Sequence, residues 1–348
     1  MAPTTALRGH PRVTLADVGR RAGCSAAAVS LWVNGKSDGR LTAENVERIA
    51  KAVEELGYVP NRAAQKLALG SSQSVSFLFP GALYGDFIAS VVDGVSSHLG
   101  PDWEVAFVDA KPSAGGGGVS PLERALRSNP SGLVVSAPSQ QLLDGLERVA
   151  VPTVVIDAPN APAHTSLVSM ALEPSIADLA AHLASLGHDT VAYVSFVAES
   201  LSLASRRTQV SGHLAALGIR MVPDDLLLST LRVSDTLDAF TEVWPSWSAS
   251  GVTAVICADD RHAYGVIAGA RALGVDIPGD LSLVGFNDLD PNIVIDPPLA
   301  AISLPASQMG ERGGDALAEH IRSGEPARIE LATAYVPRAS VGPRPPRS

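Results

Sequence analysis

One stretch near the N-terminus, residues 25 to 34, pairs an apolar face with a face of small and polar side chains. Helical spacing places Val29, Trp32 and Val33 together, at i, i+3 and i+4. The opposite face would then carry Ala26, Ala27, Ser30, Leu31 and Asn34. A helix in the major groove of DNA presents such a face to the edges of the bases. The chemistry that this stretch could perform is therefore contact with bases.

Motifs for catalysis or metal binding are incomplete in the sequence. The glycine run at residues 115 to 118 lacks the G-x-G-x-x-G spacing and is typical of a flexible loop. Residues 35 to 37, Gly-Lys-Ser, resemble the end of a phosphate-binding loop, but Ser30 stands where that motif needs glycine. The eight histidines are scattered. Cys24 and Cys257 form no metal-ligand cluster, and two cysteines fit a reducing compartment. We therefore expect no enzyme activity, no cofactor and no metal.

The elements that must position the base-facing side chains are three short helices. Thr14 is a good N-cap for the first helix, and the acidic residue three positions later completes a start like a capping box. Gly23 allows a tight turn, and Ser25 can cap the second helix. A third helix would start after Thr42 and end at Gly57. The apolar positions that could close a small core are Leu15, Val18, Ala22, Val29, Trp32, Val33, Val46, Ile49, Ala50, Val53 and Leu56.

Two runs in this region match a known family. Residues 13 to 34 read VTL.DV...AG.S...VS..VN, and residues 55 to 68 read ELGYVPNRAAQKLA. In these runs the chain resembles the LacI family of bacterial transcriptional repressors. The resemblance implies that the second helix reads the major groove and that a hinge helix after Tyr-x-Pro enters the minor groove, where Leu67 wedges into the central base step. The residues implied to contact DNA are Thr14, Ser25, Ala26, Ala27, Ser30, Leu31, Asn34, Asn61, Arg62, Lys66 and Leu67.

The hinge and the recognition helix each carry a further expectation. Residues 61 to 68 are fewer than the roughly 12 to 15 that a stable isolated helix needs, so we expect this hinge to be disordered without DNA. Ala26, Ala27 and Leu31 stand where the family usually has longer polar side chains, and they cannot form bidentate hydrogen bonds to bases. Direct readout should be sparse. It would rest on thymine methyl groups, on a few short polar side chains and on DNA shape.

From residue 75 onward, short apolar strands alternate with segments of helix length, which is the signature of parallel sheets covered by helices. We expect an α/β chain: a small all-α helix-turn-helix headpiece followed by a two-lobed, parallel-sheet core. The resemblance implies that this core is like periplasmic sugar-binding proteins, with the chain crossing between lobes near residues 170, 303 and 327. The expected division is a disordered leader at 1–11, the headpiece at 12–60, a hinge and linker at 61–74, the core at 75–342 and a disordered tail at 343–348. The N-lobe would comprise about 75–169 and 304–327, and the C-lobe about 170–303 and 328–342.

A candidate effector site follows from the resemblance. Polar side chains at the carboxyl ends of parallel strands face the crevice where open α/β folds bind ligands. The implied contacts are Phe87, Arg206, Asp259, Asp260 and Asn287. The sequence departs from the family pattern, since Gln209, Asp259 and Asn287 replace Gly, Asn and Asp, and Arg207 could fill the arginine position. Asp260 and Asp288 could instead cap helices or turns, and Phe87 could pack in the core. Trp244 and Trp247 could stack on a sugar, but we favour packing.

Charge and composition define the partners and the class of protein. The net charge is −10. Residues 1 to 70 nevertheless carry ten Lys/Arg against six Asp/Glu, a balance of +4, whereas residues 71 to 348 carry sixteen against thirty. Only the N-terminal part suits a phosphate backbone. No signal peptide or long apolar run is visible. We expect a cytoplasmic regulator that binds pseudo-palindromic operator DNA as a homodimer or higher oligomer and responds to a small molecule, a carbohydrate above all. A sugar-binding transport component and an α/β enzyme are the alternatives; the headpiece and the lack of a catalytic motif oppose them.

Overall fold

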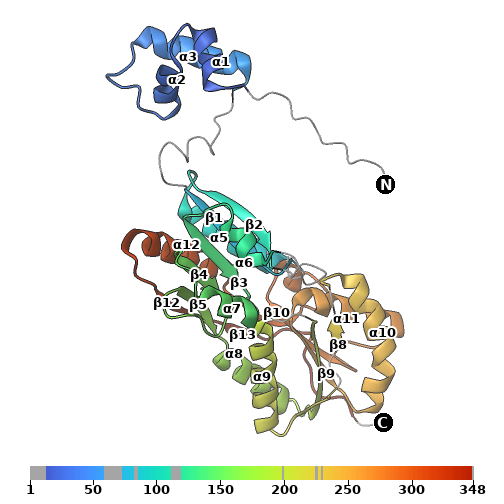
Figure 1. The fold of residues 1–348 in the computed structure, drawn as a ribbon. Helices are drawn as coiled ribbons and strands as arrows, with labels where there is room; N and C mark the ends of the chain where they lie inside the picture. The colour runs from blue at the N-terminus through green and yellow to red at the C-terminus, as the bar shows by residue number, and fades with distance from the viewer. Residues whose placement is uncertain are drawn as a thin grey trace, which may run out of the picture. The chain divides into compact units, whose positions relative to one another are not determined.

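The chain forms two compact units, residues 1–72 and 73–348 (Figure 1). The computed structural model describes residues 13–58, 73–81, 85–110, 119–197, 200–223, 226–228 and 230–346. The expected leader, the glycine run at 115–118 and the hinge lie outside the described residues. The DNA contacts expected there are those of Asn61, Arg62, Lys66 and Leu67.

The first unit contains the three expected helices, α1 (Leu15–Ala22), α2 (Ala26–Val33) and α3 (Ala43–Leu56). Their predicted caps are confirmed: the hydroxyls of Thr14, Ser25 and Thr42 each accept a hydrogen bond from the backbone N–H three residues later. Gly23 and Gly57 end α1 and α3 with φ of +67° and +59°, values that glycine adopts without strain. The fully buried side chains at the centre of this unit are Val18, Val29 and Ile49.

The N-lobe of the second unit is built on a six-stranded sheet in which every pairing is parallel (Figure 1). Its order is β12-β5-β4-β3-β1-β2. The strands are β1 (Ser74–Phe79), β2 (Glu104–Asp109), β3 (Gly132–Ser136), β4 (Thr153–Ile156), β5 (Ser166–Ala171) and β12 (Arg328–Ala332). Helices α5 (Asp86–Leu99) and α12 (Ala306–Ser323) pack on one apolar cluster of this lobe, and α6 (Pro121–Leu126) and α7 (Gln140–Leu146) pack on the other.

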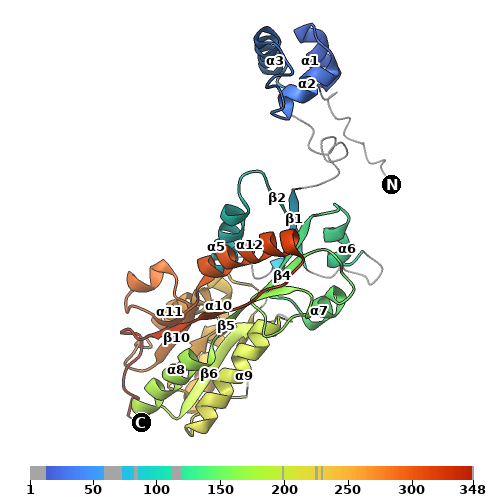
Figure 2. The same ribbon diagram turned by 90° about the vertical axis from the view of Figure 1, so that its left-hand side faces the viewer.

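The C-lobe has a second sheet, of which Figure 2 labels β6 and β10. Its order is β13-β11-β10-β9-β6-β7, and β8 also pairs with β6. The strands are β6 (Thr190–Phe196), β7 (Arg220–Met221), β8 (Leu226–Leu228), β9 (Ala254–Cys257), β10 (Ser282–Asn287), β11 (Ala300–Ser303) and β13 (Ala334–Val336). Helices α8 (Glu173–Ser185) and α9 (Leu201–Ala216) contribute to one core cluster, and α10 (Val233–Ala249) and α11 (Asp260–Leu273) contribute to the other. A short 3-10 helix, η2 (Asp290–Ile293), follows β10. The predicted α/β class is confirmed.

The last crossing between lobes lies later than the resemblance implied. Strand β12 pairs in parallel with β5, from Arg328 opposite Leu167 to Ala332 opposite Ala171, so residues 328–332 belong to the N-lobe. Their expected assignment to the C-lobe was wrong. The strand is an edge strand with alternating exposed and half-buried residues, so its position depends on backbone pairing that the sequence pattern does not specify. The chain returns to the C-lobe only after this strand, at β13.

The C-terminal segment is held to the C-lobe, although its proline and arginine content predicted a free tail. The Ser340 hydroxyl donates to the carbonyl of Leu283 (2.6 Å) and accepts from the N–H of Ala300 (2.9 Å). The Nε2 atom of buried His188 lies 3.0 Å from the carbonyl oxygen of Gly342, and burial lowers the pKa of this histidine. Arg344 pairs with Asp189 (2.6 Å). These contacts fix the segment on the C-lobe, so the expected tail at 343–348 was wrong at least as far as Arg344.

Two further features bear on packing. Trp247 is 2% exposed, and Trp244 stacks on Phe240 with ring centroids 5.5 Å apart, which confirms the packing interpretation. Helices α5 and α12 lie in backbone contact: a Cβ added at Gly94 would be 2.7 Å from both the Ser307 carbonyl oxygen and the Glu311 nitrogen.

Within the described residues, no helix is both long and apolar enough to cross a membrane.

Candidate functional site

The expected recognition face of α2 is exposed only in the first turn of the helix. Val29 is fully buried, whereas Ala26 and Ala27 are exposed in the first turn. The other residues expected to face DNA, Ser30, Leu31 and Asn34, are half-buried. The short side chains at the start of the helix therefore leave its N-terminal end open to approach by another molecule, as a helix entering a groove requires.

Polar groups of the headpiece that were expected to contact DNA take part in local hydrogen bonds. The Thr14 hydroxyl donates to the Asp17 carboxylate (2.6 Å), and this bond is the main cause that lowers the pKa of Asp17. The Ser25 hydroxyl accepts from the N–H of Ala28 (3.1 Å). The Asn34 side-chain amide donates to the carbonyl oxygen of Ser30 (2.7 Å). Each of these groups thus helps to begin or end a helix.

The charge of the described headpiece is balanced. Residues 13 to 58 contain six Lys/Arg and six Asp/Glu, and Arg21 pairs with Glu55 while Arg20 pairs with Asp17 (3.2 Å). The positive balance of residues 1 to 70 therefore comes from the flanking segments, which carry Arg8, Arg12, Arg62 and Lys66.

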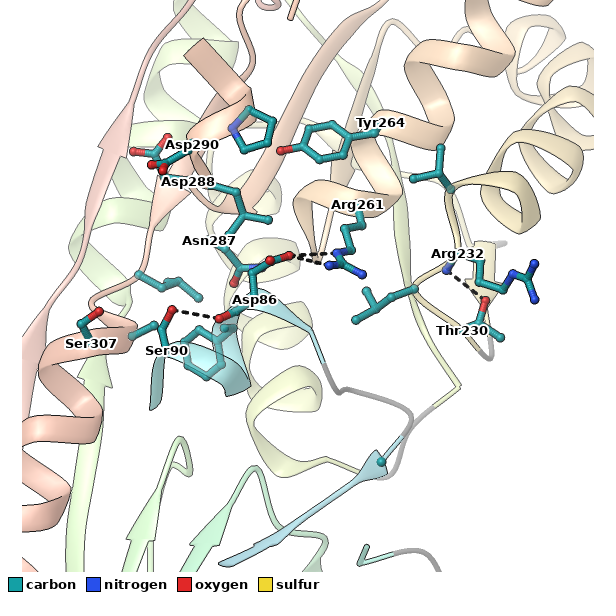
Figure 3. A pocket seen from close by; sticks show the side chains of 18 residues that line it. Asp86, Ser90, Thr230, Arg232, Arg261, Tyr264, Asn287, Asp288, Asp290 and Ser307 are labelled. Atoms are coloured by element: carbon teal, nitrogen blue, oxygen red, sulfur yellow. Dashed lines mark hydrogen bonds and ion pairs between the residues drawn. The ribbon is translucent and has the colours of Figure 1, made fainter. Parts of the chain in front are cut away.

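A cavity of about 1020 Å³ lies between the two lobes of the second unit (Figure 3). The N-lobe contributes the starts of α5 and α12, and the C-lobe contributes the segment before α10, part of α11 and the loop after β10. Its lining mixes carboxylates, guanidinium groups, hydroxyls and apolar side chains. The lining includes Asp86, Phe87, Arg261, Tyr264, Asn287 and Leu289.

An ion pair joins the lobes across this cavity. The Arg261 guanidinium on α11 lies 2.7 Å (Nη2) and 2.9 Å (Nε) from the Asp86 carboxylate on α5 (Figure 3). The two side chains are 38% and 51% exposed, so the pair contributes little to stability. The ion pair nevertheless connects elements of different lobes, and a ligand in the cavity would contact it directly.

The structure separates the five residues expected to bind an effector into two groups. Phe87 and Asn287 line the cavity. Asp259 lies next to Asn287, whose amide donates to the Asp259 carboxylate (2.8 Å), and the other oxygen of Asp259 caps α11 by accepting from the N–H of Arg261 (2.8 Å). Asn287 has φ of +108°, a strained value for a residue other than glycine. Asp259 and Asn287 thus form one polar unit at the cavity wall.

Asp260 lies outside the cavity lining and is fully buried. One carboxylate oxygen accepts from the N–H of Leu289 (2.8 Å). Burial is the main cause that raises the pKa of Asp260 to about 8, and the negative charges of Asp259 and Asp288 add to it. The helix-capping alternative considered for Asp260 applies to Asp259. Contact of Asp260 with an effector stays a prediction that the geometry does not favour.

Arg206 is also buried, at a second junction between the lobes. Its guanidinium donates to the carbonyl oxygen of Ala258 (3.0 Å) and lies 4.6 Å from the centre of the Phe286 ring. Asp157, at the end of β4 in the N-lobe, accepts from the Ser202 hydroxyl on α9 of the C-lobe. Burial raises the pKa of Asp157, and the charge of Arg206 lowers it. Of the two candidate arginines, Arg206 is the buried one and Arg207 is half-buried.

Several residues of this region were not found from the sequence. Asp86 and Arg261 are 175 positions apart, and no local pattern connects them. Tyr264 lines the cavity one turn after Arg261 and donates to Asn292 (2.7 Å). The only sequence signal for these residues was their place near predicted helix starts, where open α/β folds bind ligands.

Comparisons with known proteins identify both units. Residues 14–61 match the model for bacterial regulatory proteins of the lacI family. Residues 180–341 match a periplasmic binding protein-like domain. The chain is 24% identical to the HTH-type transcriptional repressor PurR of Pasteurella multocida, over 95% of this chain and 99% of the relative. It is 28% identical to the HTH-type transcriptional regulator MalR of Streptomyces coelicolor, over 90% and 91%.

Solved structures share the fold. The lac repressor dimer bound to operator and the anti-inducer ONPF is 23% identical, with a TM-score of 0.75 over 95% of this chain and 100% of that one. A transcriptional regulator CelR–cellobiose complex is 22% identical, with a TM-score of 0.66 over 94% and 100%. Residues 14–61 thus form a DNA-binding domain of the lacI family and residues 180–341 lie in a periplasmic binding protein-like domain, and transcriptional regulators with this combination align with nearly the whole chain.

Proposed function

We propose that this DNA-binding transcriptional regulator is a repressor that binds a pseudo-palindromic operator as a homodimer and changes its operator affinity when a small carbohydrate binds between the lobes. The observation that carries the proposal is the cavity of about 1020 Å³ with walls from both lobes. In this proposal the protein acts in the cytoplasm and catalyses no reaction. Support comes from similar proteins, one described as bound to operator and an anti-inducer and another as a complex with cellobiose.

The chemistry of the cavity suits a sugar. Carboxylates and guanidinium groups can form paired hydrogen bonds with neighbouring hydroxyls. The cavity offers Asp86 and Arg261 for this purpose, and Asn287 adds an amide. Apolar side chains such as Phe87 and Leu289 can pack against the less polar face of a sugar ring. A ligand that contacts both lobes binds one lobe arrangement better than another and so shifts the equilibrium between them.

The experiment that tests this function uses the full-length protein. Operator sequences are selected from a random DNA pool, and a panel of mono- and disaccharides is then screened for a change in operator affinity. For the sugar that responds, Asn287→Ala should weaken sugar binding about tenfold or more, because an amide that bonds the ligand is lost. Its operator affinity without sugar should be unchanged.

Asn160→Ala is the matched control, since Asn160 is exposed and lies outside the cavity lining. It should bind the sugar like the parent. If no DNA sequence is enriched, the proposed function is wrong. If an operator is found but Asn287→Ala binds the responding sugar normally, the assignment of Asn287 is wrong.

A separate prediction concerns the hinge. Leu67→Ala should weaken operator binding and reduce DNA bending, because an apolar wedge that unstacks a base step permits the bend that brings more protein into contact. Gel retardation with circularly permuted operator fragments measures both quantities. Equal affinity and equal bend angle for parent and variant would rule out the wedge; the proposed phosphate or groove contacts of Asn61, Arg62 and Lys66 would then need their own substitutions.

A further inference from the structure

The open end of the recognition helix presents methyl groups. Ala26 and Ala27 are the first two residues of α2, and both are exposed. Leu31, one turn after Ala27, is half-buried and also apolar. None of these three side chains can donate or accept a hydrogen bond. The part of the helix that would enter a groove first is therefore an apolar surface.

The short polar groups beside this surface are already used inside the headpiece. Ser25 caps α2 through its hydroxyl, and Asn34 donates to the Ser30 carbonyl at the other end of the helix. The Thr14 hydroxyl donates to Asp17 and accepts from its N–H in the capping box of α1. Giving up an N-cap typically costs about 0.5–2 kcal/mol. A base contact that displaced one of these bonds would therefore work against the fold of the headpiece, whereas contacts from the methyl groups of Ala26 and Ala27 displace none.

We infer that α2 identifies its half-site through the 5-methyl group of thymine, which the side chains of Ala26 and Ala27 contact. This inference rests on the proposed operator binding and specifies its chemistry. The thymine methyl is the one apolar group on the major-groove edges of the four bases. A surface of alanine methyls can pack against it, but cannot distinguish the hydrogen-bonding atoms of the base that carries it.

Substitutions that change one chemical group of a base test this inference directly. With the operator selected by the full-length protein, each half-site thymine is replaced in turn by deoxyuridine, which removes only the methyl group. At one or two positions per half-site, affinity should fall about fourfold per methyl, the loss expected for exposing one buried methyl-sized group. Thymines outside the half-sites serve as the control and should tolerate the change.

A second pair of substitutions separates methyl contact from hydrogen bonding. At the sensitive positions, a 5-methylcytosine–guanine pair should bind better than a cytosine–guanine pair by the same factor of about four, because it restores the methyl while reversing the neighbouring hydrogen-bonding pattern. In the Ala27→Gln variant, the deoxyuridine effect at the position read by Ala27 should disappear.

The outcomes distinguish this inference from the proposed function. Failure to enrich any operator overturns both. An operator whose half-sites lack thymine, or one in which deoxyuridine binds like thymine at every position, overturns the methyl readout alone and leaves operator binding intact. Loss of affinity with deoxyuridine but no gain from 5-methylcytosine also overturns it, since a hydrogen bond to the base would then decide the sequence.

Discussion

Replacing Gly94 with alanine should lower the free energy of unfolding of the second unit by about 1 to 3 kcal/mol, the usual cost of forcing extra atoms into a packed core. The added Cβ would lie 2.7 Å from the Ser307 carbonyl oxygen and from the Glu311 nitrogen. Both are backbone atoms of α12, so neither can move aside by rotating a side chain. The two helices would have to separate, and the apolar contacts between them would weaken along their length.

Gly212→Ala is the matched control for this change. Gly212 also lies inside a helix, α9, but it is exposed, and apart from its own helix no atom of the described residues lies within 4 Å of a Cβ built there. Alanine should therefore raise stability by up to about 1 kcal/mol through helix propensity alone. Urea denaturation of the full chain, followed by near-ultraviolet circular dichroism, compares the two variants. Equal shifts for both would contradict the proposed backbone contact between α5 and α12.

The second large effect is expected from Asp260→Asn. Burial raises the pKa of Asp260 to about 8, whereas the same carboxyl in an unfolded chain releases its proton near pH ~4. Between these values the folded state binds more protons than the unfolded state, so the free energy of unfolding falls as pH rises through this window. Above about pH 8 both states are ionised and the fall ends.

Asparagine cannot ionise, and its carbonyl oxygen can still accept from the N–H of Leu289. Asp260→Asn should therefore remove this pH dependence and stabilise the chain at pH 8, by on the order of 5 kcal/mol relative to its effect at pH 4. Urea denaturation at intervals from pH 4 to pH 9 measures the difference. Asp238→Asn, at an exposed carboxylate on α10, controls for the loss of one negative charge. A parallel pH dependence for Asp260→Asn and the parent would show that Asp260 is ionised in the folded protein at neutral pH.

Local chemistry decided which parts of the fold the sequence could predict. The caps at Thr14, Ser25 and Thr42 act within three residues of the helix they begin, and the apolar strands of both sheets reveal their burial by composition. The headpiece and the general alternation of apolar strands with helices from residue 75 onward were therefore predictable. Strand β12 and the segment around Ser340 were not, because backbone and hydroxyl hydrogen bonds to distant residues hold them.

The candidate site shows the same division. Phe87 and Asn287 were placed by a family resemblance and do line the cavity. The contacts that set the character of the site, such as Arg261 with Asp86, depend on two lobes meeting. Burial of Arg206 and Asp260 also arises from that packing. Sequence patterns specify which residues sit near strand ends, but not which of them the opposite lobe covers.

The position of β12 and β13 late in the sequence affects the order in which parts of the protein can fold during synthesis. Strand β12 completes the edge of the N-lobe sheet, and β13 with Ser340 completes the C-lobe. Neither lobe can reach its final hydrogen bonding until the last part of the chain has left the ribosome, whereas the headpiece, at residues 13–58, emerges first and has its own core. A chain that ends early would therefore carry a folded DNA-binding unit on an incomplete regulatory domain.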